Sequence, residues 1–166
     1  MSHGPFSHVD ILLPDGNLLG ASDSPKAPVI VGNPRGVAIR PPTYQPFGLK
    51  LTMVIATPRA KYIRALAMTQ LGKPFDNGAL NGFLSDAMPG ARNWRDPTVW
   101  FCSELVMWAF ELSGYWGGIL SVWPKNRISP GDMTMIFLFD TNWTNRDKFW
   151  PEPTNPVVVA AARPAG

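Results

Sequence analysis

The chain has 166 residues, of which 45% are apolar and 16% are charged, a balance typical of a globular domain with a sizeable core. Its formal net charge is only +3 and no run of Lys and Arg occurs, so we expect no nucleic-acid partner. No apolar run reaches the roughly 18 residues of a membrane-spanning helix, so we expect no integral membrane segment. One cysteine excludes an internal disulfide and a cysteine-based zinc site, and two histidines leave little for a metal cluster. We therefore expect neither a metal nor a cofactor.

The two ends of the chain carry separate expectations. The N-terminal residues 1–6 lack the basic and apolar regions of a signal peptide. We expect synthesis in the cytoplasm, and delivery by another route, a secretion apparatus or a phage particle, if the protein acts outside the cell. Residues 1–150 are expected to form a single domain, and the Pro- and Ala-rich residues 151–166 a tail with room for one added strand at 157–159. The oligomeric state stays open.

Short apolar runs in the first third of the chain predict strands. The first two flank Pro14-Asp15-Gly16, in which proline fixes φ and glycine permits unusual φ, so they should form a hairpin. The fifth is the best candidate for a central strand, because it is the longest apolar run of the group. The predicted strands are 8–13, 17–21, 29–31, 36–40 and 49–56.

Helical signals begin at Thr57-Pro58, a suitable N-cap followed by proline at the first helical position. Apolar residues at helical spacing continue to Leu71, and Gly72 ends the pattern. Residues 75–99 are rich in Gly and Pro and predict a long irregular connection. The apolar run 134–139 predicts a buried strand.

Residues 100–114 contain the only cysteine, Cys102, and predict a buried helix that begins at it and stops at Gly114. Ser103 is the N-cap, or Cys102 and Ser103 together occupy the first turn. In both cases the sulfur lies near unpaired backbone N–H groups and the positive end of the helix dipole, which favours the nucleophilic thiolate. The alternative is a small buried hydrophobic residue. Glu104 has no catalytic role in this interpretation, because a carboxylate would compete with a thiolate.

A thiol nucleophile needs a general base and a group that orients the base. His8 is the better base, because His3 belongs to the N-terminal end. Asp10 shares a strand face with His8 at a separation of about 6.5 Å, close enough for its carboxylate to reach the imidazole. The alternatives are an ordinary histidine at a strand end and a solvated aspartate.

Seven tryptophans are spread over the second half of the chain, and packing is their default role. Three of them, in predicted loops on either side of the cysteine helix, could instead line a cleft for sugar or acyl groups. These are Trp94, Trp116 and Trp123.

Several short pieces of the sequence together resemble the circularly permuted NlpC-like branch of the papain-like cysteine hydrolases. The resemblance spans roughly residues 7 to 139, and Cys102-Ser103-Glu104-Leu105-Val106 is its most specific piece. In the unpermuted family the Cys helix precedes the His strand, whereas here the His strand comes first. The resemblance implies an α+β fold, with an antiparallel sheet packed against the Cys helix. The pieces are Ser7–Leu12, Leu18–Ser22, Gly36-Val37, Leu71–Asp76, Phe101–Val106 and Ile128–Asp132.

The resemblance implies that Cys102 is the nucleophile and His8 the base. Family members often place a polar third group on the strand after the His strand, about where Gly20 stands here. Glycine cannot orient an imidazole, so we expect Asp10 to replace it, with Ser22 or a main-chain carbonyl as lesser options.

Three functions follow from this resemblance. The first is a thiol hydrolase of amide bonds, chiefly in peptidoglycan peptides of the cell wall. The second is a lipid acyltransferase or thioesterase that uses the same site. The third is a binding module that has kept the fold without turnover. The expected partner is accordingly a peptide or acyl substrate.

Overall fold

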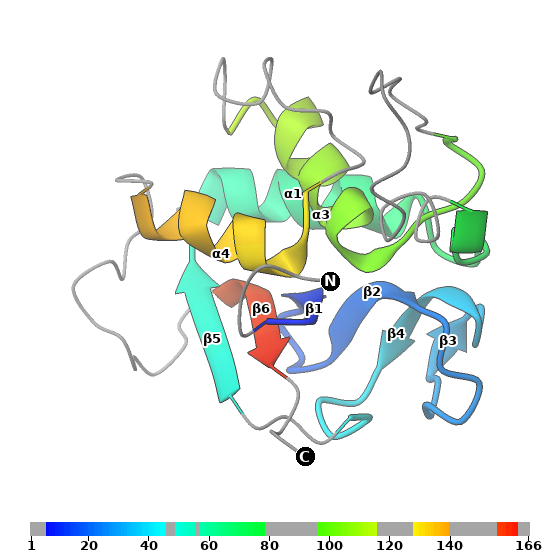
Figure 1. Ribbon diagram of the computed structural model, residues 1–166. Coiled ribbons are helices and arrows are strands. Elements are labelled where there is room, and N and C mark those ends of the chain that lie inside the picture. Colours follow the sequence, from blue (N-terminus) through cyan, green and yellow to red (C-terminus); the bar gives the residue numbers. More distant parts are fainter. Residues whose placement is uncertain are drawn as a thin grey trace, which may run out of the picture.

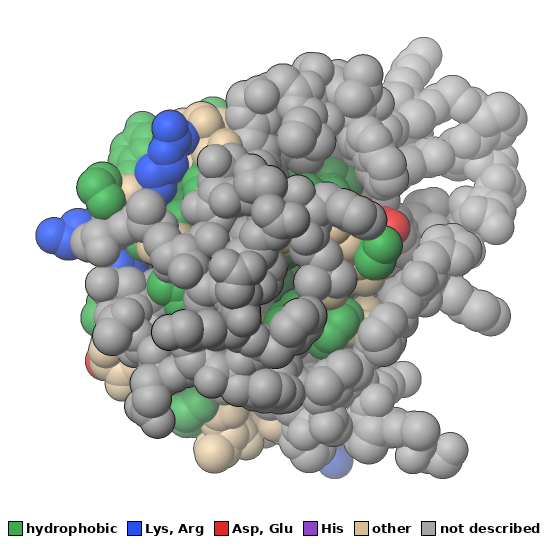
Figure 2. Space-filling model, turned by 90° about the vertical axis from the view of Figure 1, so that its left-hand side faces the viewer, with side chains coloured by type: hydrophobic (Ala, Val, Ile, Leu, Met, Phe, Trp, Pro, Cys, Tyr) green, Lys and Arg blue, Asp and Glu red, His purple; other side chains and the backbone are tan. Residues whose placement is uncertain are grey.

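The computed structural model describes residues 6–45, 49–55, 57–78, 96–115, 128–139 and 156–162. These residues form a mixed α+β structure in which helices cover one side of a six-stranded sheet (Figure 1). The strand order is β3-β4-β2-β1-β6-β5, and every neighbouring pair is antiparallel. The predicted α+β class with an antiparallel sheet is confirmed. On the face shown in Figure 2, most Lys and Arg side chains of the described residues lie toward the left-hand edge, beside hydrophobic side chains.

The strands β1 (His8–Leu12) and β2 (Leu18–Ser22) form the predicted hairpin. Gly16 lies in its turn with φ +84°, a conformation that favours glycine. The backbone N–H of Leu13 donates to the carbonyl of Asn17 at 2.8 Å and closes the turn. The turn chemistry in the sequence therefore sets the register of the strand that carries His8.

The predictions for the outer strands of the sheet are only partly confirmed. β4 (Gly36–Arg40) has the predicted bounds and pairs with β2 along its length. β3 is only Val31–Gly32, shorter and later than the strand expected at 29–31. β5 (Leu49–Val54) lies at the opposite edge of the sheet, so the prediction that it is central is wrong.

Helix α1 (Thr57–Met68) includes Thr57, the predicted N-cap, as its first residue and ends at Met68, before the predicted Leu71; Gly72 follows with φ +88°. The chain then returns to the sheet, where Pro74 forms a bridge with Gly36. A Cβ on Gly36 would lie 2.0 Å from the carbonyl oxygen of Lys73. The close approach of these two backbones therefore requires glycine.

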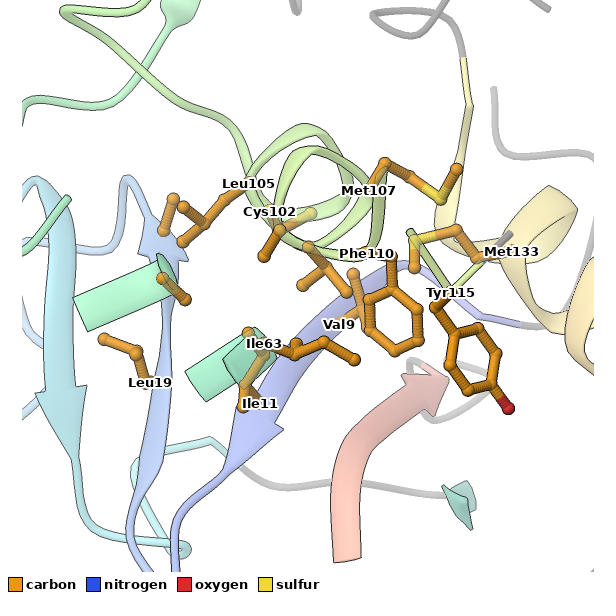
Figure 3. Packing of buried hydrophobic residues seen from close by; sticks show 14 of the residues in the cluster. Val9, Ile11, Leu19, Ile63, Cys102, Leu105, Met107, Phe110, Tyr115 and Met133 are labelled. Carbon is orange, nitrogen blue, oxygen red and sulfur yellow. The ribbon is translucent and has the colours of Figure 1, made fainter. Parts of the chain in front are cut away.

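Helix α3 (Cys102–Leu112) begins at the cysteine, with Phe101 as its N-cap and without a side-chain capping bond. Cys102 and Ser103 therefore share the first turn, the second of the two predicted arrangements. Gly114 follows the C-cap with φ +67°, as a helix stop requires. Most of the helix is buried, and its apolar side chains pack against those of β1, β2 and α1 (Figure 3).

Residues 134–139 belong to helix α4 (Pro130–Phe139), so the prediction of a strand there is wrong. Its start carries a reciprocal cap: the backbone N–H of Asp132 donates to Ser129 Oγ at 3.0 Å, and that of Ser129 donates to Asp132 Oδ2 at 2.9 Å. Pro130 at the first helical position completes the signal. A short apolar run fits a buried strand or a buried helix equally well, and the residues before it decide between them.

The segment expected to be a tail contains β6 (Pro156–Ala162), longer than the predicted added strand. β6 lies between β1 and β5 and pairs with both. This part of 151–166 is consequently an inner strand of the sheet and belongs to the domain. β6 places Ala161 opposite His8 and Val159 opposite Asp10, so it supports the strand that carries both side chains.

Candidate active site

The first strand brings His8 and Asp10 together. His8 begins β1 and is mostly buried, with 12% of its side chain exposed, while Asp10 lies two residues further on the same strand face. His8 Nε2 lies 3.0 Å from Asp10 Oδ1. A carboxylate only accepts, so Nε2 must carry a hydrogen when it bonds to Asp10. The other ring nitrogen, Nδ1, is then the one that can take a proton.

Gly20 on β2 provides the space for the Asp10 side chain. A Cβ at position 20 would lie 1.8 Å from Asp10 Oδ1 and 2.9 Å from its Cγ. Such contacts are far below van der Waals distance, so no larger residue fits unless the carboxylate moves. Gly20 was expected to leave the imidazole without an orienting group. It instead leaves room for the Asp10 carboxylate, which comes from the neighbouring strand.

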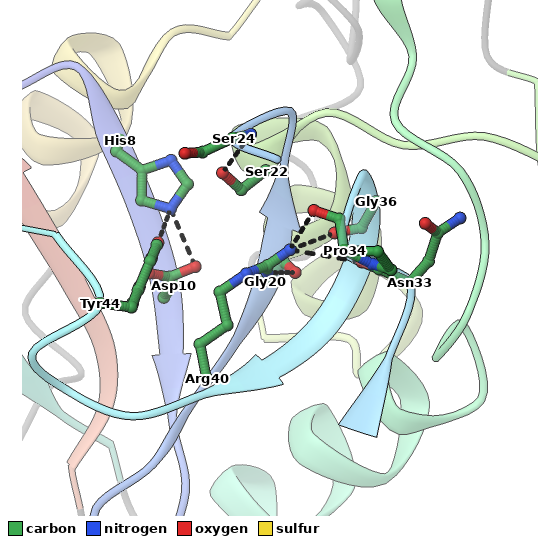
Figure 4. A network of polar contacts seen from close by, with 10 residues as sticks. All are labelled: His8, Asp10, Gly20, Ser22, Ser24, Asn33, Pro34, Gly36, Arg40 and Tyr44. Carbon is green, nitrogen blue, oxygen red and sulfur yellow. Dashed lines mark hydrogen bonds and ion pairs between the residues drawn. The ribbon is translucent and has the colours of Figure 1, made fainter. Parts of the chain in front are cut away.

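Tyr44 joins this pair from the turn after β4. Its hydroxyl donates to Asp10 Oδ2 at 2.7 Å, and its oxygen lies 2.6 Å from His8 Nε2 (Figure 4). Tyr44 is not among the site residues predicted from the sequence. Pro41 and Pro42 indicate that the chain turns here, but no local pattern shows that the phenol faces the histidine.

Arg40, at the end of β4, is 1% exposed and packs beside the same group. Its guanidinium donates to the carbonyls of Gly20 and Gly36, each at 3.0 Å, and lies 5.5 Å from the centre of the Tyr44 ring. A buried charge needs partners of this kind. Arg40 is also not among the predicted site residues, because a strand-end arginine is ordinarily solvated.

Cys102, in the first turn of α3, contributes a hydrogen bond and a charge that raise the pKa of His8. Burial alone would lower the pKa of His8, but the charges of Asp10 and Cys102 and hydrogen bonds to both raise it from 6.5 to about 10. The structure therefore brings the three predicted residues, Cys102, His8 and Asp10, into one interacting group. An imidazolium is the favoured state of this histidine beside the ionised Asp10.

The charges around Asp10 favour its ionised form. Burial alone would raise the pKa of its carboxyl, yet the charge of His8, hydrogen bonds from His8 and Tyr44, and the charge of Arg40 lower it below 3.8. Burial and Asp10 both raise the pKa of Tyr44 well above its ordinary value, so the phenol keeps its proton. Asp10 is accordingly an acceptor on both oxygens, and Tyr44 is a donor to it.

Other candidates take different places. Ser22 Oγ accepts from the backbone N–H of Ser24 at 3.3 Å, a local turn contact. Trp100 is buried, donates from its indole to Gln70 Oε1 at 3.1 Å, and serves packing. Outside the described residues lie His3, Trp94, Trp116 and Trp123.

The described residues contain no group of three or more His, Cys, Asp or Glu side chains that could hold a metal ion. None of their helices has the length and hydropathy required to span a membrane.

Comparisons of the chain with protein-family models, with curated proteins and with solved structures found no match. The residues and their geometry are therefore the whole basis for a function.

Proposed function

We propose that the protein is a cysteine hydrolase of amide bonds, with peptides of peptidoglycan as its substrate class. The observation that carries this proposal is the connected group of Cys102, His8 and Asp10, in which a thiol and a carboxylate act on the same imidazole. A nucleophile, a base and an orienting group are the parts that covalent acyl transfer needs. The permuted papain-like fold is part of the proposal, and it is supported by the His strand preceding the Cys helix in the chain.

In the first half of the reaction, His8 Nδ1 takes the proton of the Cys102 thiol. The thiolate attacks the carbonyl carbon of the amide and forms a tetrahedral intermediate. Its C–N bond breaks as the imidazolium gives the proton to the leaving amine, which leaves a thioester on Cys102.

In the second half, Nδ1 takes a proton from water, and the resulting hydroxide attacks the thioester. The C–S bond breaks, the carboxylic acid product leaves, and the proton returns to the sulfur. At the start of α3, the first backbone N–H groups have no acceptor within the helix, and the side chain of the N-cap Phe101 has no oxygen to offer them. They are suited to stabilise the negative oxygen of both tetrahedral intermediates.

The same steps would cleave a lipid ester or thioester, so the substrate must be settled by experiment. Purified peptidoglycan and acyl esters would be incubated with the wild-type protein, and released amino groups and fatty acids measured. We expect amino groups from peptidoglycan and no fatty acid. Release of fatty acid alone would instead support a lipid acyltransferase or thioesterase that uses the same residues.

The roles of the residues are tested by Cys102→Ala and His8→Ala. Both should abolish turnover, since neither a nucleophile nor a base remains. His3→Ala is the matched control, because it removes the only other histidine and should leave turnover unchanged. Equal, measurable activity of Cys102→Ala and wild type would refute the proposal, and absence of turnover in the wild type would favour the binding module.

A further inference from the structure

We propose that Tyr44 is a positioning residue of this site, which holds Asp10 and His8 in one arrangement and keeps the imidazole hydrogen on Nε2. The inference rests on the proposed function, because it assigns Nδ1 as the base that serves Cys102. Tyr44 itself acts through Asp10 and His8, and touches neither the thiol proton nor the scissile bond in this mechanism.

The Tyr44 hydroxyl lies between Asp10 and His8 and has only one proton to donate. A phenol has one hydrogen, and that of Tyr44 is donated to Asp10 Oδ2 at 2.7 Å. At 2.6 Å from His8 Nε2, the Tyr44 oxygen must therefore accept, as Asp10 Oδ1 does at 3.0 Å. Two acceptors face one ring nitrogen, so the hydrogen of the neutral imidazole is held at Nε2 and Nδ1 is left with its lone pair.

Tyr44 also fixes the orientation of the Asp10 carboxylate. Asp10 is 2% exposed, and a buried carboxylate oxygen without a donor is costly. Asp10 Oδ1 accepts a hydrogen bond from His8, and Oδ2 accepts one from Tyr44. Because each oxygen has its own donor, the carboxylate cannot rotate about its χ2 torsion without breaking both bonds. Tyr44 thus fixes the orientation of the group that orients the base.

Tyr44 is itself held in place by residues that do not belong to β1. Its backbone N–H donates to the Pro41 carbonyl at 3.1 Å, which closes the turn after β4. Its ring lies against the Arg40 guanidinium, which is bonded to carbonyls of β2 and β4. The phenol is therefore braced by two strands that carry neither His8 nor Asp10 (Figure 4). A positioning group that is fixed independently of the residues it positions can hold them in place.

The test is Tyr44→Phe, which removes one oxygen and keeps the ring against Arg40, so the fold should remain. Tyr62→Phe is the matched control, because Tyr62 lies on α1 and is 53% exposed. The readouts are the 15N chemical shifts of the His8 ring, recorded above about pH 10 where the ring is neutral, and the pH at which the Asp10 carboxyl titrates by 13C NMR. In Tyr44→Phe we expect a mixed tautomer of the neutral ring and a higher pKa of Asp10, since a hydrogen bond that favours the ionised form is lost.

Turnover is measured on the same variants. Tyr44→Phe should lower kcat by about 10- to 100-fold, the size of effect seen when the hydrogen-bond partner of a metal-bound histidine is removed, with little change in KM. Wild-type 15N shifts and wild-type kcat in Tyr44→Phe would overturn the inference. The NMR readouts need no substrate. If wild-type protein hydrolyses nothing tested but the shifts change as expected, the proposed function fails and the positioning role stands; unchanged shifts in an active enzyme reject the role of Tyr44 alone.

Discussion

At the scale of single residues, the side chain of Asp10 depends on the absence of a side chain at Gly20. The carboxylate of one fills the position where the side chain of the other would lie. The two residues face each other across the pairing of β1 with β2, so neither can be changed without regard to its neighbour.

Gly20→Ala should force the Asp10 carboxylate away from His8, because the new Cβ would lie 1.8 Å from Oδ1. We expect a loss of about 1–3 kcal/mol in the free energy of unfolding, the usual cost of overpacking, together with reduced turnover. Urea denaturation measures the first effect. In the Asp10→Ala background the same change should cost far less, since both contacts shorter than 3.0 Å are removed. Additive losses in this double-mutant cycle would show that the two residues do not share the space.

Asp10→Asn should keep the fold, because it is nearly isosteric, and should lower kcat. An amide offers either an oxygen or an NH2 to Nε2 and can therefore stabilise the wrong tautomer. In the Ser-His-Asp triad the equivalent change costs about 10⁴ in kcat. We expect a smaller loss here, because a Cys-His ion pair depends less on its third member. Steady-state hydrolysis with thermal unfolding as a folding control measures it, and wild-type turnover would remove Asp10 from the mechanism.

At the scale of elements, the last described strand supports the first. β6 pairs with β1 along the residues that include His8 and Asp10, and with β5 on its other side. The site therefore depends on a segment about 150 residues away in the chain, through backbone pairing alone.

Val159→Pro tests that dependence. Proline removes a backbone N–H from a strand that is paired on both sides, where proline is not tolerated. An unpaired buried acceptor alone costs about 1–3 kcal/mol, and the ring adds steric conflict. We expect a melting temperature lower by several degrees or more, measured by circular dichroism. Val159→Ala keeps the N–H and is the control; equal stability of the two variants would show that β6 adds nothing through its pairing.

At the scale of the whole molecule, stability should depend on pH through the buried His8–Asp10 pair. The folded pKa of His8 is raised from 6.5 to about 10, so the protonated form is stabilised in the folded state. This contribution is complete below about pH 6.5 and is lost as pH rises to about 10. The folded pKa of Asp10 is lowered, so its contribution is complete above about pH 3.8 and is lost as pH falls further.

Urea unfolding of the wild type between pH 4 and pH 10.5 should therefore show a decline in stability that begins above roughly pH 6.5. His8→Gln, which has no titrating ring, should lack the part of the decline that belongs to this residue. Parallel curves for the two proteins would contradict the assignment of the raised pKa to His8.

The sequence by itself determined the features that a few adjacent residues encode. The β1–β2 hairpin follows from Pro14-Asp15-Gly16, and the start and end of α3 follow from Cys102 and Gly114. The pairing of His8 with Asp10 could also be predicted, because alternation along a strand fixes which side chains share a face. All of these depend on backbone preferences within one element.

Only the tertiary structure decided the rest. Residues 134–139 are apolar in a way that suits a strand or a helix, and β6 finds its place only because β1 and β5 each offer an edge. The approach of Tyr44 to His8 and the space that Gly20 leaves for Asp10 each join residues from separate segments of the chain. Local patterns carry no information about which side chains meet when separate elements pack, and those meetings complete the site.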